Sequence, residues 1–115
     1  MNATPVRAVH ETAVPPRQLA SFHEQLAQQR QFRLEQLEEL RAIDPDDRSE
    51  VTAVLAAGAR SSLGDVLAAL DRLADGTYGV CVDCGTRLPL NRLEVLPQVA
   101  HCLRCSQHAA ARAGR

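Results

Sequence analysis

The chain has 115 residues, a formal net charge of −1, 45% hydrophobic residues and only 3% aromatic residues. This length allows one small domain with an extension. The nearly neutral charge gives no electrostatic footprint for nucleic acid, so direct sequence-specific DNA binding is not expected. The hydrophobic residues are mainly Ala, Leu and Val, and Trp is absent. This composition favours helices over a sandwich of strands.

The basic residues and the N-terminal segment bear on source and compartment. All thirteen basic residues are Arg, and Ala is abundant, which favours a GC-rich, bacterial gene. No signal peptide is visible at the N-terminus, and nowhere do eighteen apolar residues run together. The sequence therefore predicts a cytoplasmic protein without a membrane partner, in a compartment where thiols stay reduced.

The first part of the chain divides into a tail and a long helix. Residues 1–16 hold three prolines and no periodic pattern, so we expect a disordered tail. Residues 17–43 contain no Gly or Pro and predict a helix with a stripe at steps of three and four. The stripe positions are Leu19, Phe22, Leu26, Arg33, Leu37 and Leu40.

The segment DPDDRSE, residues 44–50, interrupts the helical pattern. Asp44 is a suitable N-cap, with Pro45 at the first helical position and two more acids in the first turn. A second helix is therefore expected over residues 46–75, ending at Asp75-Gly76. Its apolar stripe comprises Val51, Val54, Leu55, Leu63, Val66, Leu67, Leu70 and Leu73.

Folding about Pro45 pairs positions whose numbers sum to about 90, so the two stripes meet in register. This pairing predicts that Leu37 faces Val54 and that Leu26 faces Leu63. Residues 17–75 are therefore expected to form an antiparallel coiled-coil hairpin with an acidic tip at 44–50. The predicted fold class is mainly α: this hairpin, a small four-cysteine finger, and a short C-terminal helix or tail over residues 106–115.

All four cysteines lie in two pairs with the spacing C-x2-C-x17-C-x2-C, namely Cys81, Cys84, Cys102 and Cys105. Four thiolates from two such knuckles form a tetrahedral shell that suits zinc. Two disulfides, a thiol redox pair and an iron–sulfur cluster are the alternatives. A closed four-ligand site is structural, and in residues 76–105 one Zn²⁺ substitutes for a hydrophobic core.

The segment GTYGVCVDCGTRLPLNRLEVLPQVAHCLRC resembles the DksA/TraR family of bacterial transcription regulators. The resemblance rests on Gly76, Tyr78 and Gly79 before the first knuckle and on Gly85 directly after it. It continues with Arg92-Leu93, Pro97 and the second knuckle. It covers the finger strongly and the preceding hairpin in architecture.

This resemblance implies that the chain binds RNA polymerase and inserts its coiled coil through the secondary channel, where acidic tip residues perturb transcription. Long-form members carry a D-x-x-D-x-A motif at the tip. Asp44 and Asp47 match its two acids, and Ser49 stands where the family has Ala. In the finger, Arg87 and Arg92 are candidate partner contacts.

Some family members bind guanosine tetraphosphate jointly with polymerase through basic residues, and this property is not expected here. Gly58, Asp65 and Ser106 occupy the corresponding positions, and none is basic, so the nucleotide site is predicted to be absent or weak. The chain also lacks the hydrolase, phosphate-loop and zinc-protease motifs of enzymes. The alternative function is a zinc-finger adaptor whose hairpin binds another protein without tip-dependent action on polymerase.

Overall fold

The structure of the protein is a computed structural model that describes residues 14–113. Its elements in chain order are α2 (Pro16–Ile43), α3 (Glu50–Asp75), α4 (Leu90–Val95) and α5 (Leu103–Ala113). In the described residues the only β pairing is an isolated antiparallel bridge between Val80 and Arg87. The predicted mainly α fold class is confirmed. The tail prediction falls largely on residues 1–13, which lie outside the described residues.

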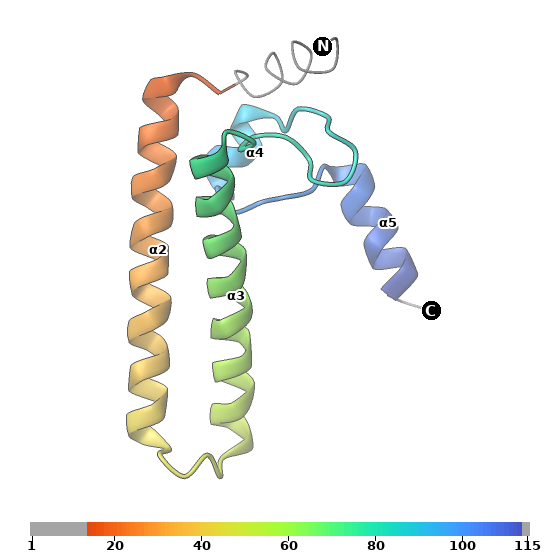
Figure 1. The fold of residues 1–115 in the computed structure, drawn as a ribbon. Coiled ribbons are helices and arrows are strands. Elements are labelled where there is room, and N and C mark those ends of the chain that lie inside the picture. Colours follow the sequence, from red (N-terminus) through yellow and green to blue (C-terminus); the bar gives the residue numbers. More distant parts are fainter. Residues whose placement is uncertain (1–13, 114–115) are drawn as a thin grey trace.

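Helices α2 and α3 run side by side in opposite directions and form the hairpin (Figure 1). Helix α2 begins at Pro16, and Pro15 is its N-cap residue. Proline is favoured in the first turn because the backbone nitrogens there have no hydrogen-bond partner within the helix. Twenty-eight residues at about 1.5 Å each give a rod of about 40 Å. At the far end of α3, Gly76 adopts the left-handed conformation with φ 85°, which caps the helix.

The second helix begins later than predicted. Asp44 is the C-cap of α2 and not the N-cap of α3, and Pro45 lies in the connecting turn. Ser49 is the actual N-cap, because its hydroxyl oxygen accepts a hydrogen bond from the Thr52 amide at 3.2 Å. Aspartate and serine are both favoured N-cap residues, but the Asp44 side chain instead accepts hydrogen bonds from the backbone of the turn.

The packing face of α3 also differs from the predicted stripe. Val51 and Val54 are 69% and 71% exposed, and Leu55 and Leu67 are exposed as well. At the end near the finger, the other predicted stripe residues, Leu63, Val66, Leu70 and Leu73, are buried or half-buried. The predicted stripe followed the bulkier apolar side chains along the whole helix. Near the tip, this predicted stripe is wrong.

Helical geometry explains the shift. Steps of three and four residues taken back from Val66 lead to Leu63, Ala59, Ala56 and Thr52, and not to the valines. Ala59 is buried, and Thr52 and Ala56 are half-buried. Leu37 and Leu40 of α2 line one groove with Thr52 and Ala56, so the predicted pairing of Leu37 with Val54 is wrong.

The hydrophobic core lies where the hairpin meets the finger. Tyr78 is buried there, with its ring centroid 5.5 Å from that of Phe22. Its hydroxyl donates a 2.7 Å hydrogen bond to the Pro97 carbonyl oxygen. Burial raises the pKa of Tyr78 to about 12. The buried members of this core are Val14, Phe22, Leu26, Val66, Ala69, Tyr78, Cys81, Leu88 and Leu93.

Helix α3 is long and apolar enough, by length and composition alone, to cross a membrane. In this fold it pairs with α2 along the hairpin (Figure 1), and the same apolar residues supply the packing face at its finger end. Only 17% of the apolar window of α3 is buried, so the hairpin packing accounts for part of its apolar character.

Candidate functional site

The first cysteine knuckle is a tight turn closed by backbone hydrogen bonds. The Gly85 amide donates to the Cys81 carbonyl at 2.9 Å, and the Cys81 amide donates to the Thr86 carbonyl at 2.8 Å. Gly85 has φ 76°, a left-handed conformation that glycine adopts without steric cost. The turn thus places the sulfurs of Cys81 and Cys84 on the same side.

The second knuckle leads directly into α5. The Cys105 amide donates to the Cys102 sulfur at 3.4 Å, and the Ser106 amide donates to the Cys102 carbonyl at 2.9 Å. The two knuckles are joined by a 2.9 Å bond from the Val82 amide to the Ala100 carbonyl. The main chain therefore fixes both knuckles relative to each other.

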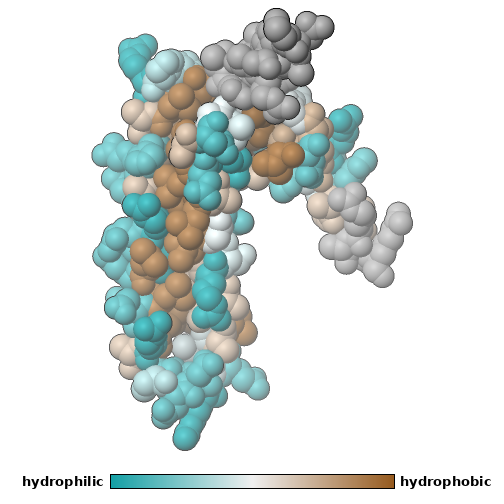
Figure 2. Space-filling view, in the orientation of Figure 1, coloured by the Kyte–Doolittle hydropathy of each residue, from teal (hydrophilic) through white to brown (hydrophobic). Residues whose placement is uncertain are grey.

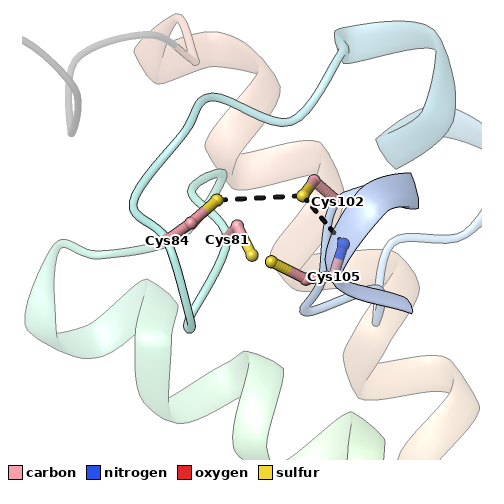
Figure 3. A group of neighbouring side chains, drawn as sticks. All are labelled: Cys81, Cys84, Cys102 and Cys105. Atoms are coloured by element: carbon pink, nitrogen blue, oxygen red, sulfur yellow. Dashed lines mark hydrogen bonds between the residues drawn. The ribbon is translucent and has the colours of Figure 1, made fainter. Parts of the chain in front are cut away.

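The four cysteine side chains point toward one another (Figure 3). All four sulfurs lie within 4.8 Å of one another, and the Cys84 and Cys102 sulfurs are 3.8 Å apart. Tetrahedral zinc with Zn–S bonds of about 2.3 Å requires sulfurs about 3.8 Å apart. The donor set and its spacing fit zinc, and the four cysteines hold one structural Zn²⁺.

The thiols of this cluster differ in acidity. Burial tends to raise the pKa of Cys81, but hydrogen bonds from the backbone of Cys102, Cys84 and Asp83 lower it to about 6. The neighbouring Cys102 sulfur, aided by desolvation, raises the pKa of Cys105 to about 12. Without metal, the Cys105 thiol thus keeps its proton at neutral pH, and zinc binding must displace it.

At the other end of the hairpin, Asp44 organises the tip. One carboxylate oxygen accepts a 3.0 Å bond from the Arg48 amide, and the other accepts a 2.9 Å bond from the Ser49 amide. The Asp47 amide also donates to the Asp44 carbonyl at 3.1 Å. The Asp44 side chain is half-buried. Its main structural effect is therefore to close the turn between α2 and α3.

Asp47 and Asp46 are the acids that the turn presents to solvent. Both are exposed, and Asp47 is the only non-glycine residue with positive φ among the described residues, at 55°. This conformation is rare for residues other than Gly, Asn and Asp, and the turn thereby fixes the direction in which the Cα–Cβ bond of Asp47 leaves the backbone. Figure 2 shows hydrophilic residues gathered at this end of the rod.

Replacing Ser49 with alanine restores the residue type that the resembling family carries, but it removes the cap of α3. We expect Ser49→Ala to lower the free energy of unfolding by about 1 kcal/mol, because the Thr52 amide loses its acceptor. Urea denaturation measures this loss. Ser61→Ala, an exposed mid-helix substitution, is the matched control. An equal loss in both variants contradicts the capping role.

The finger arginines lie in different settings. Arg87 is exposed beside the isolated bridge to Val80. Arg92 is half-buried in α4, and its Nε atom is buried without a hydrogen-bond partner. Arg87 is therefore the more accessible of these two candidate contacts, which both stay predictions.

Two structural features that support the site were not predicted from the sequence. Helix α4 carries the fully buried Leu93 within the x17 spacer, although six residues are too few for a periodic signal. Val14, placed in the predicted tail, is buried against Gly79. The Pro-rich composition around Val14 masked its role in the core.

A helical hairpin joined to a closed four-cysteine metal centre defines the class: a coiled-coil protein with a structural zinc finger. Residues 76–107 match the family model of the prokaryotic dksA/traR C4-type zinc finger. The finger of this chain is therefore a C4-type zinc finger of the dksA/traR kind.

The chain is also similar to three other proteins. The chain is 32% identical over 54 residues to an uncharacterized protein of Aquifex aeolicus, and 45% identical over 38 residues to the uncharacterized protein YlyA of Bacillus subtilis. These segments span 37% and 31% of the length of those relatives. The fold also resembles transcription factor DksA2 from Pseudomonas aeruginosa, with TM-score 0.69 and 24% identity, covering 95% of this chain and 98% of that one.

Proposed function

We propose that this protein is a DksA/TraR-type regulator that binds RNA polymerase and inserts its acidic-tipped coiled coil into the secondary channel. The zinc finger is the globular base that holds the hairpin. The chain acts in this proposal as a binding module, since four sulfur ligands leave no open metal position for catalysis. Its site of action is the bacterial cytoplasm.

The geometry of the tip is the observation that carries this proposal. A rod of about 40 Å ends in a turn in which Asp44 is bonded to the backbone and Asp47 faces solvent. Asp44 and Asp47 are also the two acids that match the family's tip motif. A carboxylate held at the end of a narrow rod can act at short range on Mg²⁺ or on basic loops.

The two acids then have separate parts. Asp44 shapes the turn through Arg48 and Ser49, while Asp47 makes the contact with the partner. Ser49 supports the turn by capping α3. The finger arginines Arg87 and Arg92 remain candidate contacts at the base, and no joint guanosine tetraphosphate site is proposed.

Asp47→Asn tests the proposal, with Asp46→Asn as the matched control. Both substitutions remove one negative charge from an exposed turn residue, and Asn tolerates positive φ as Asp does. We expect Asp47→Asn to bind core RNA polymerase nearly as well as the unchanged protein, but to lose at least about tenfold of its effect on multi-round transcription. Asp46→Asn should keep most of that effect.

The outcomes separate the two candidate functions. Equal loss in both variants means that only net tip charge matters, which contradicts a specific role for Asp47. Polymerase binding without any effect of either substitution contradicts the tip mechanism. Absence of binding by the unchanged protein favours the alternative, a zinc-finger adaptor whose hairpin binds another protein.

A further inference from the structure

Burial is distributed unevenly along the hairpin. The buried residues of α2, Phe22 and Leu26, lie in the half nearer the finger, and along the chain no residue between Leu26 and Ala59 is buried. We call residues 27–58, which include the turn, the distal arm. Of its larger apolar side chains, only Leu37 and Leu40 are half-buried, and the others are exposed: Phe32, Leu34, Ile43, Val51, Val54 and Leu55.

The contact between the two helices of the distal arm is thin. On α2, the half-buried positions include the polar residues Gln29, Arg33 and Gln36. On α3, they are the small residues Thr52 and Ala56. Little apolar surface is therefore removed from water here, and burial of apolar surface is the main source of tertiary stability.

Polar contacts do not replace the missing burial. Arg33 donates to the Gln36 side-chain oxygen at 2.9 Å, and Gln31 donates to Glu35 at 2.9 Å, both within α2. Among the described residues, no side-chain hydrogen bond or ion pair joins the body of α2 to that of α3. The bonds of Asp44 to the backbone close only the turn.

Glycine weakens the helix further at this point. Gly58 ends the distal arm on α3, and a Cβ added there meets no atom within 4 Å. No contact within the chain requires glycine at this position, although glycine costs about 1 kcal/mol in a helix interior. Gly64, nearer the finger, is likewise free of neighbours around an added Cβ.

From these four observations we infer that the hairpin is built in two parts, a rigid base and a distal arm that opens locally while the base stays folded. The tip acids are carried on the part that opens first. Local opening of weakly packed segments at lower free energy than global unfolding is a general property of proteins. The inference concerns the free protein and does not depend on the proposed function.

Native-state hydrogen exchange on the zinc-loaded protein, with Gly58→Ala and Gly64→Ala, tests the inference. Both variants add one methyl group to an open position of the same helix. Gly58→Ala should raise the protection of distal-arm amides about fivefold and leave amides near Phe22 and Val66 unchanged. Gly64→Ala should raise protection only in the base. An equal rise throughout the hairpin in both variants overturns the inference, because it shows a single cooperative unit.

Arg33→Leu gives a second, independent measurement. Leucine at this half-buried position would add apolar surface to the distal arm, so distal-arm protection should rise about fivefold. Arg30→Leu, at an exposed position one turn away, is the control and should leave it unchanged. If Arg33→Leu fails to raise distal-arm protection, thin packing is not the cause of local opening and the inference is wrong.

Discussion

Cys81→Ser is expected to abolish stoichiometric zinc binding and to unfold the finger. Cys81 is the buried ligand of the four, and a serine hydroxyl does not supply the thiolate that zinc requires. Structural zinc contributes on the order of 10 kcal/mol of binding free energy in finger peptides. The total stability of a domain is about 5–15 kcal/mol. Metal analysis and the dispersion of finger amide resonances measure the result.

The loss should spread into the hairpin base. Phe22, Leu26 and Val66 belong to the same core as Tyr78 and Leu93 of the finger, so unfolding of the finger uncovers them. Helical circular dichroism should therefore also fall. Val82→Ser, between the ligands at an exposed position, is the control and should keep its zinc. Normal zinc content in Cys81→Ser would contradict the assignment of this ligand.

Gly79→Ala has the second large expected effect, a loss of roughly 2–4 kcal/mol in the free energy of unfolding. Gly79 has φ 94°, which disfavours any side chain, and an added Cβ would lie 2.8 Å from the Val14 Cγ2 atom. Both strain and overlap therefore act at one position. Urea denaturation of the zinc-saturated protein measures the change.

Two further variants divide this cost. Gly85→Ala has a comparable φ of 76° but no atom within 4 Å of the added Cβ, so it should show the backbone strain alone. Adding Val14→Ala to Gly79→Ala should recover part of the loss by removing the overlapping methyl group. If Gly85→Ala costs as much as Gly79→Ala, the contact with Val14 contributes nothing.

The zinc centre could be predicted in full from the sequence, because ligand type and spacing determine it without knowledge of the rest of the fold. The two long helices were also predictable from periodicity. The tip was harder. Asp44 and Ser49 are both good N-caps by residue type, and only the path of the turn decides that Asp44 binds loop amides while Ser49 caps α3.

The predicted register of the hairpin was wrong for a related reason. By hydrophobicity alone, Val51 and Val54 are better core candidates than Thr52 and Ala56. However, the packing at the finger end decides which face of α3 meets α2, and helical geometry carries that face toward the tip through Ala56 and Thr52. Val14 and α4 were missed because one buried residue before a helix, or a helix of six residues, leaves no periodic pattern. Long-range packing, rather than local preference, decides these features.

The antiparallel hairpin has a topological consequence. An outward pass along α2 and a return along α3 bring the chain back to its starting end, so Val14 and α5 both belong to the finger end (Figure 1). A fluorophore attached at the start of α2 is thereby kept about one rod length from Asp47. The molecule can be tethered from one end while the other is left free to enter a confined space.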